Sequence, residues 1–155
     1  MSSEAISIPK SERPKRLWVV AIMNIAVALM SIVALVFLLS SSKVPAEVVP
    51  SILSAAFSAL LAAGVIASSV LALLGSHRAR WIALTMALIF FGLIWLHSLI
   101  AALDPEGVIG VVPTDRQSQK LWAGVVRTSI EIGLNLWVFL SAKTRMFFDG
   151  RRAEA

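Results

Sequence analysis

Long apolar runs separated by short polar segments dominate the pattern along this chain. Four such runs occupy 17–40, 51–75, 81–103 and 121–142, and each is 22 to 25 residues long. A helix of that length crosses a hydrocarbon core of ~30 Å. Backbone polar groups in lipid need partners within their own segment, so a continuous apolar run is expected to be helical. The pattern predicts an all-α, polytopic membrane protein, an antiparallel bundle of four transmembrane helices.

Composition supports this interpretation, because 58% of the 155 residues are hydrophobic and only 15% are charged. A soluble domain of this size buries too little surface to hide that excess. The predicted layout is a basic tail at 1–16, a membrane domain at 17–142 and a second basic tail at 143–155. The first apolar run is longer than the ~7–15 apolar residues of a signal peptide, so it is predicted to be a retained helix.

Basic residues gather at alternate ends of the predicted helices and set the expected orientation. The side that holds both tails has ten of them, against three on the other side. In a bacterial inner (plasma) membrane, such a bias predicts that both termini lie in the cytoplasm. The ten are Lys10, Arg13, Lys15, Arg16, Arg78, Arg80, Lys143, Arg145, Arg151 and Arg152, and the three are Lys43, Arg116 and Lys120.

Aromatic residues mark the expected membrane interfaces. Trp18, Trp81 and Trp122 stand at the starts of three apolar runs, where an amphipathic ring prefers the headgroup layer. Met146-Phe147-Phe148 is expected to anchor the second tail at the interface. The basic residues that give the net charge of +5 are expected to lie at the lipid surface. No nucleic-acid partner is therefore expected.

The second apolar run differs from the others in its small residues. Ser58, Ala59, Ala63 and Gly64 belong to two faces with a spacing of four residues. Small residues let membrane helices approach closely. These faces predict that the second helix touches two neighbours and lies toward the centre of the bundle.

A polar stripe crosses the fourth run. Arg127, Glu131 and Asn135 follow one another at intervals of four residues and share one helix face. His97 in the third run is expected at the depth of Arg127, and Asn24 in the first run at the depth of Asn135. One stripe on the fourth helix is therefore predicted to face both of them.

Three interpretations of this stripe remain open. Arg127 and Glu131 can form an intrahelical ion pair, with Asn24 and Asn135 joining helices by hydrogen bonds. The stripe can instead bind a partner's membrane segment or a lipid headgroup. An ionisable residue inside a membrane is also a functional hypothesis in its own right, here a proton or cation path through Glu131.

Enzymatic chemistry finds no support in the sequence. No catalytic Ser/His/Asp set, phosphate-binding glycine loop or zinc motif is present. There is no cysteine, and the two histidines, His77 and His97, fall in a predicted loop and a predicted helix. The expectation is a non-enzymatic protein with no metal and no cofactor.

Two segments carry a resemblance to known proteins: Leu17–Val20 with Asn24, and the final run from Leu136 through Phe148. On these the chain resembles small uncharacterised four-helix bacterial inner-membrane proteins, and in layout it is similar to immunity-type membrane proteins. The resemblance brings no established activity. The expectation is therefore a protein that binds a membrane partner, as an accessory subunit or immunity-type protein, or that forms a homo-oligomer. The alternative is a small transporter or channel component using Glu131, although small multidrug exporters carry their carboxylate in the first helix, which has none here.

Overall fold

The computed structural model describes residues 14–41, 50–75, 77–109 and 113–152. Of these residues 93% are helical, and none of them forms a strand. The described helices are α1 (Lys15–Ser40), α2 (Ile52–Leu74), α3 (His77–Leu103), α4 (Pro105–Ile109), α5 (Asp115–Leu140) and α6 (Ala142–Arg152).

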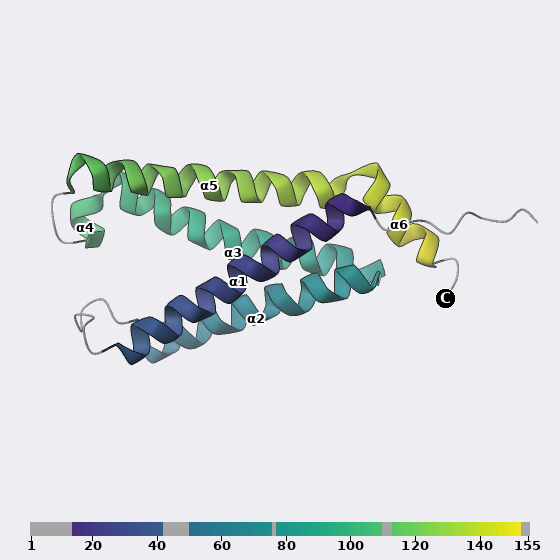
Figure 1. The fold of residues 1–155 in the computed structure, drawn as a ribbon, viewed down its shortest axis with the longest axis horizontal. Coiled ribbons are helices and arrows are strands. Elements are labelled where there is room, and N and C mark those ends of the chain that lie inside the picture. The colour runs from purple at the N-terminus through teal and green to yellow at the C-terminus, as the bar shows by residue number, and fades with distance from the viewer. Residues whose placement is uncertain (1–13, 42–49, 76, 110–112, 153–155) are drawn as a thin grey trace, which may run out of the picture.

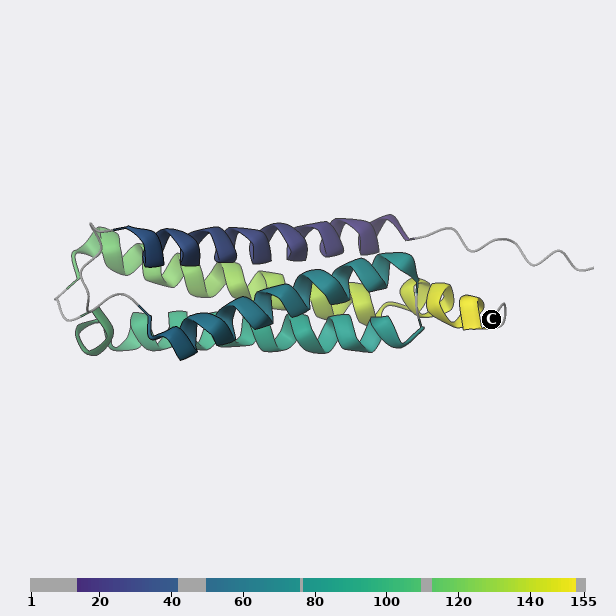
Figure 2. The same ribbon diagram turned by 90° about the horizontal axis from the view of Figure 1, so that it is seen from below.

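The prediction of four long apolar helices is confirmed. Helices α1, α2, α3 and α5 are each long and apolar enough to cross a membrane. These helices lie lengthwise along the molecule (Figure 1). The start of α1 and the whole of α6 lie at one end, here called the termini end, and α4 lies at the other, here called the α4 end (Figure 2).

Local sequence signals explain where α2 begins and ends. The Ser51 side chain accepts a hydrogen bond from the backbone N–H of Ser54 at 3.2 Å, as an N-cap residue does. Gly75 ends the helix with a φ of 82°, a left-handed conformation that glycine adopts without steric cost. The connection to α3 is therefore very short, and α3 starts four residues before the predicted boundary, at His77.

Helix α5 begins six residues before its predicted start because the preceding polar segment is helical. Thr114 and Gln117 form a capping box, in which the Gln117 side chain accepts a hydrogen bond from the Thr114 backbone N–H at 2.9 Å. The segment that follows α3 also leads into a helix, the single-turn α4. The Asp104 carboxylate accepts from the Gly107 backbone N–H at 3.0 Å, and Pro105 takes the first helical position.

The second basic tail folds back onto the bundle as α6, and the expectation for its aromatic pair is wrong. Phe147 and Phe148 are buried against protein, and only Met146 is exposed. The reason is the helical spacing, which turns the two rings toward α1, α3 and α5 while Met146 faces outward. Most of the first tail, 1–13, lies outside the described residues, as do 153–155.

Two apolar clusters make up the core. The first lies at the termini end and joins α1, α2, α3, α5 and α6 through ten buried residues, among them Leu17, Phe139 and Phe148. The second, in the middle of the bundle, packs Phe90 and Phe91 of α3 against small and β-branched residues of α1 and α2. The buried side chains of the described core are therefore concentrated at the termini end and in the middle of the bundle, away from the α4 end.

The expected central position of α2 is wrong. Helix α2 packs against α1 and α3, while α3 packs against α2 and α5, so no long helix occupies a centre. Gly64 does mark a close approach, because a Cβ there would collide with the Met86 side chain of α3. Ala63 and Ser58, by contrast, are exposed, and Ala59 is half-buried. Ser58 and Ala59 lie near the start of α2, where that helix diverges from α3 (Figure 1), whereas Ala63 faces the outside of the bundle.

Candidate functional site

Asn24 of α1 and Asn135 of α5 come together in the interior of the bundle. The Asn24 Nδ2 donates to the Asn135 Oδ1 at 2.8 Å, and the Asn135 Nδ2 donates to the Asn24 Oδ1 at 3.1 Å. Both side chains are fully buried. The Asn135 amide also donates to the Glu131 carbonyl at 2.9 Å. The pair lies between the two apolar clusters and fixes the register of α1 against α5.

We expect Asn24→Leu to lower the free energy of unfolding by about 1–2 kcal/mol, because it leaves the buried Asn135 amide without its partner. The double change Asn24→Leu/Asn135→Leu should recover much of that loss. A denaturant titration of the purified protein in detergent measures both values. Equal destabilisation by the single and double changes would show that the reciprocal hydrogen bonds contribute nothing specific.

Glu131 and Arg127 form an ion pair one and two turns further along the same stripe. The Arg127 Nε lies 3.4 Å from the Glu131 Oε1, with side-chain exposures of 69% for Arg127 and 11% for Glu131. The second carboxylate oxygen, Oε2, is buried without a hydrogen-bond partner among the described residues. The stripe thus points inward at Asn135 and Glu131 and reaches the surface only at Arg127.

The structure does not bring His97 to this stripe. His97 instead stands at the edge of a cleft formed by residues 31–38 of α1, residues 50–61 at the start of α2, and residues 90–97 of α3. Two other residues of α3 face α5 in its place. The Trp95 indole donates to the Ser129 hydroxyl at 2.9 Å, and Ser98 lies beside Gly124.

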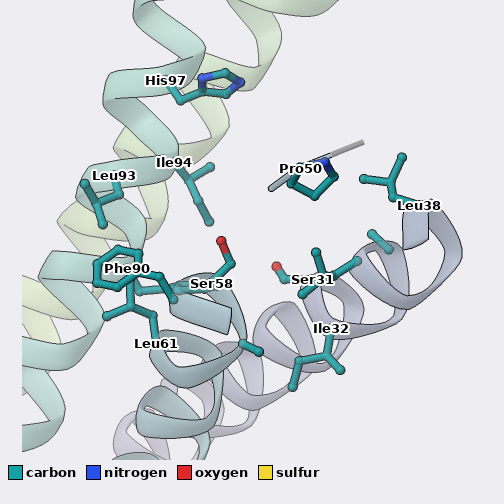
Figure 3. A pocket seen from close by; sticks show the side chains of 14 residues that line it. Ser31, Ile32, Leu38, Pro50, Ser58, Leu61, Phe90, Leu93, Ile94 and His97 are labelled. Carbon is teal, nitrogen blue, oxygen red and sulfur yellow. The ribbon is translucent and has the colours of Figure 1, made fainter. Parts of the chain in front are cut away.

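The sequence did not predict this cleft. Its volume is about 440 Å³, within the range of ~300–1,000 Å³ typical of ligand pockets. It opens where the α1–α2 hairpin diverges from α3 and α5 toward the α4 end (Figure 1). The walls are apolar apart from Ser31, Ser58 and His97, and Figure 3 shows both serine hydroxyls directed into the open space.

Two of the small residues predicted for helix packing, Ser58 and Ala59, line this cleft. The Ser31 hydroxyl donates to the Val27 carbonyl of its own helix at 3.0 Å. Within the described part of the chain, the Ser58 hydroxyl and the His97 ring have no hydrogen-bond partner. The small residues of α2 in the cleft therefore form a face that is suited to close contact with another helix and that no described helix covers.

The three predicted interfacial tryptophans lie on the outside of the bundle. Trp18 and Trp81 are exposed at the termini end, and Trp122 is exposed near the start of α5. A fourth, Trp137, is also exposed and carries the Arg16 guanidinium 4.6 Å from its ring centre. Arg16 and Trp137 lie on different helices and far apart in the sequence, so no local pattern could predict this contact.

Arg80 has a structural role that its charge alone did not reveal. It was predicted to lie in a polar loop, but it belongs to α3 and is buried. Its Nε donates to the Phe139 carbonyl at 2.7 Å, one of the last carbonyls of α5, which helix geometry leaves without an intrahelical partner. The guanidinium also lies 5.0 Å from the Trp81 ring centre. Arg80 therefore holds the end of α5 against α3.

No protein-family model matches the chain, and neither the curated proteins nor the solved structures compared with it contain a match. Its class consequently follows from its own features. Over the residues that the structure describes, it is all-helical, with four helices long and apolar enough to span a membrane, and it carries a polar stripe on α5 and an open apolar cleft.

Proposed function

We propose that this chain is a non-enzymatic integral protein of a bacterial inner membrane that binds a transmembrane helix of a partner protein, as an accessory subunit or immunity-type protein. In this proposal α1, α2, α3 and α5 form an antiparallel four-helix transmembrane bundle with both termini in the cytoplasm. In the sequence, ten basic residues fall in the two tails and the connection between the second and third spans, against three in the other two connections, and this bias supports that orientation.

The observation that carries the proposal is the cleft between α1, α2 and α3. It lies within the apolar parts of three candidate spans, so its occupant comes from within the bilayer. The stripe on α5 is a poorer docking surface, because Glu131 and Asn135 are buried inside the bundle. Only Arg127 remains accessible to a partner on that face.

The lining favours a helix as the occupant. Ser31, Ala34, Ser58 and Ala59 bring small side chains to two walls of the cleft, and helices in membranes associate where small residues allow close backbone approach. The third wall runs from Phe90 to His97, about 10 Å along α3 at ~1.5 Å per residue. The hydroxyl of Ser58 and the ring of His97 can hydrogen-bond across such an interface.

Site-specific photocrosslinking in intact membranes of the native host tests the proposal. A photoreactive residue at position 34 or 59, both in the cleft, should give an adduct of one defined protein. The same residue at position 33 or 60, which are exposed neighbours on the same helices outside the cleft, should not. Adding Ser58→Leu should abolish the adduct, because the larger side chain fills the cleft.

Adducts of equal yield at all four positions, or adducts only with lipid, would contradict partner binding in the cleft. Co-expression of two differently tagged copies identifies the remaining occupant. A crosslink between the tags would assign the cleft to a second copy of this chain and would replace the proposal with a homo-oligomer.

A small transporter or channel component is the second candidate, favoured by one observation. Glu131 is 8% exposed and has a carboxylate oxygen without a partner among the described residues, which is unusual for a purely structural group. Proton movement into reconstituted vesicles, reported by a pH-sensitive dye and abolished by Glu131→Gln, would establish this function in place of the first. No flux with either protein would leave the binding proposal standing.

A further inference from the structure

A second cavity lies at the termini end, between the start of α1 and the junction of α5 with α6. Its volume is about 420 Å³, and it is lined by Pro14, Lys15, Arg16 and by Ser141–Thr144. The cavity exists because α5 stops at Leu140 and the chain turns at Ser141 before α6 begins. The Ser141 hydroxyl donates to the Val138 carbonyl at 2.9 Å, which holds this turn in place.

The charge of the cavity is entirely positive. Lys15, Arg16 and Lys143 line it and no carboxylate does. Within the described residues these three cations have no ion-pair partner, whereas Arg145 on the outer side of α6 pairs with Asp149 at 3.6 Å. The first turns of α1 and α6 also contain no acidic residue, so no side chain in these turns offsets the positive ends of the helix dipoles.

Neighbouring aromatic residues place the cavity at the level of lipid headgroups. Arg16 lies over the exposed Trp137 ring at 4.6 Å, which holds its guanidinium in position beside the cavity. Trp18, two residues further along α1, is exposed as well. Exposed tryptophans on apolar helices are typical of the boundary between hydrocarbon and headgroups.

We propose that this cavity binds the phosphate of an anionic phospholipid headgroup. Three cationic residues line this cavity of about 420 Å³, a volume large enough for a phosphodiester with its glycerol. Arginine and lysine are the side chains that bind phosphate most strongly in proteins. Basic pockets beside transmembrane helices bind lipid headgroups in the same way. The bound lipid would link α1 to the α5–α6 turn on the outer side of the bundle, whereas the apolar core contacts this turn only on its inner side.

Native mass spectrometry of the full-length protein, purified in detergent with added phosphatidylglycerol or phosphatidylcholine, tests the site. We expect one phosphatidylglycerol to be retained in preference to phosphatidylcholine. The triple change Lys15→Gln/Arg16→Gln/Lys143→Gln should weaken that retention at least tenfold, since each basic residue near a lipid surface contributes about a fivefold gain. The charge-preserving change Lys15→Arg/Lys143→Arg should retain the lipid.

The matched control removes the same three charges elsewhere, as Arg78→Gln/Arg116→Gln/Lys120→Gln, all at exposed positions outside the cavity. Loss of lipid by this control equal to that of the first triple variant would overturn the site, because the effect would then follow net charge alone. Excess inorganic phosphate or glycerol phosphate should not displace the lipid. Displacement by either would overturn the assignment to a membrane lipid and indicate a soluble phosphate instead.

Discussion

Replacing Phe148 with alanine is expected to lower the free energy of unfolding by about 3–5 kcal/mol, the usual cost of removing a buried phenylalanine side chain. Phe148 is fully buried in the cluster that joins α6 to α1, α3 and α5. Its ring packs edge-to-face against Phe147, with centres 5.1 Å apart. The loss should be seen in a denaturant titration of the purified protein.

Met146→Ala is the matched control, because Met146 lies on the same helix and is 62% exposed. It should change the free energy of unfolding by less than about 0.5 kcal/mol, as for other surface substitutions. If both substitutions gave the same small effect, α6 would not be docked on the bundle, and the aromatic pair would act as a membrane anchor instead.

Removing Arg127 is expected to cost more than removing the charge of Glu131. Arg127→Ala leaves the buried Glu131 carboxylate without its cation, at a cost of about 2–3 kcal/mol on insertion scales for a charge inside a membrane. Glu131→Gln leaves an arginine whose side chain is 69% exposed and can extend toward the headgroups. The milder variant should therefore be Glu131→Gln, as measured by yield of folded protein and by denaturant titration.

The double change Arg127→Leu/Glu131→Leu separates pairing from individual roles. Replacing both members of the pair by apolar residues leaves no charge without its partner inside the membrane, so this variant should return to near the stability of the parent. A double variant less stable than Arg127→Ala would mean that Glu131 has a further stabilising partner, and the ion pair would not explain its burial.

The apolar spans could be predicted from the sequence because lipid imposes one solution on a long apolar run, the helix. Helix ends at short-range signals could also be derived. Ser51 precedes the first residue of α2 and Gly75 follows its last, as residue preferences predict. The Thr114 and Gln117 pattern is that of a capping box, and it predicts the start of α5. The amides of Asn24 and Asn135 share a depth along their helices, and the structure joins them.

Contacts set by helix rotation and tilt could not be derived in this way. An apolar helix in lipid has little periodicity to reveal which face is buried, so His97 was expected beside Arg127 and lies instead in the cleft. Ala63 faces the outside of the bundle although the adjacent Gly64 approaches α3, and small residues on two faces of α2 do not reveal which face is covered. Arg80 and Phe148 were assigned by their chemistry to loop and lipid, and tertiary packing buries both.

Reporter fusions in intact cells test most directly the claim that α1, α2, α3 and α5 all cross the membrane. A reporter active only outside the cytoplasm should be active when fused after residue 43 or residue 112. It should be silent when fused after residue 78 or at the C-terminus. A second reporter, active only inside the cytoplasm, should be active at those two positions. An active outside reporter at the C-terminus would contradict the four-span arrangement, and with it the placement of the cleft within the bilayer.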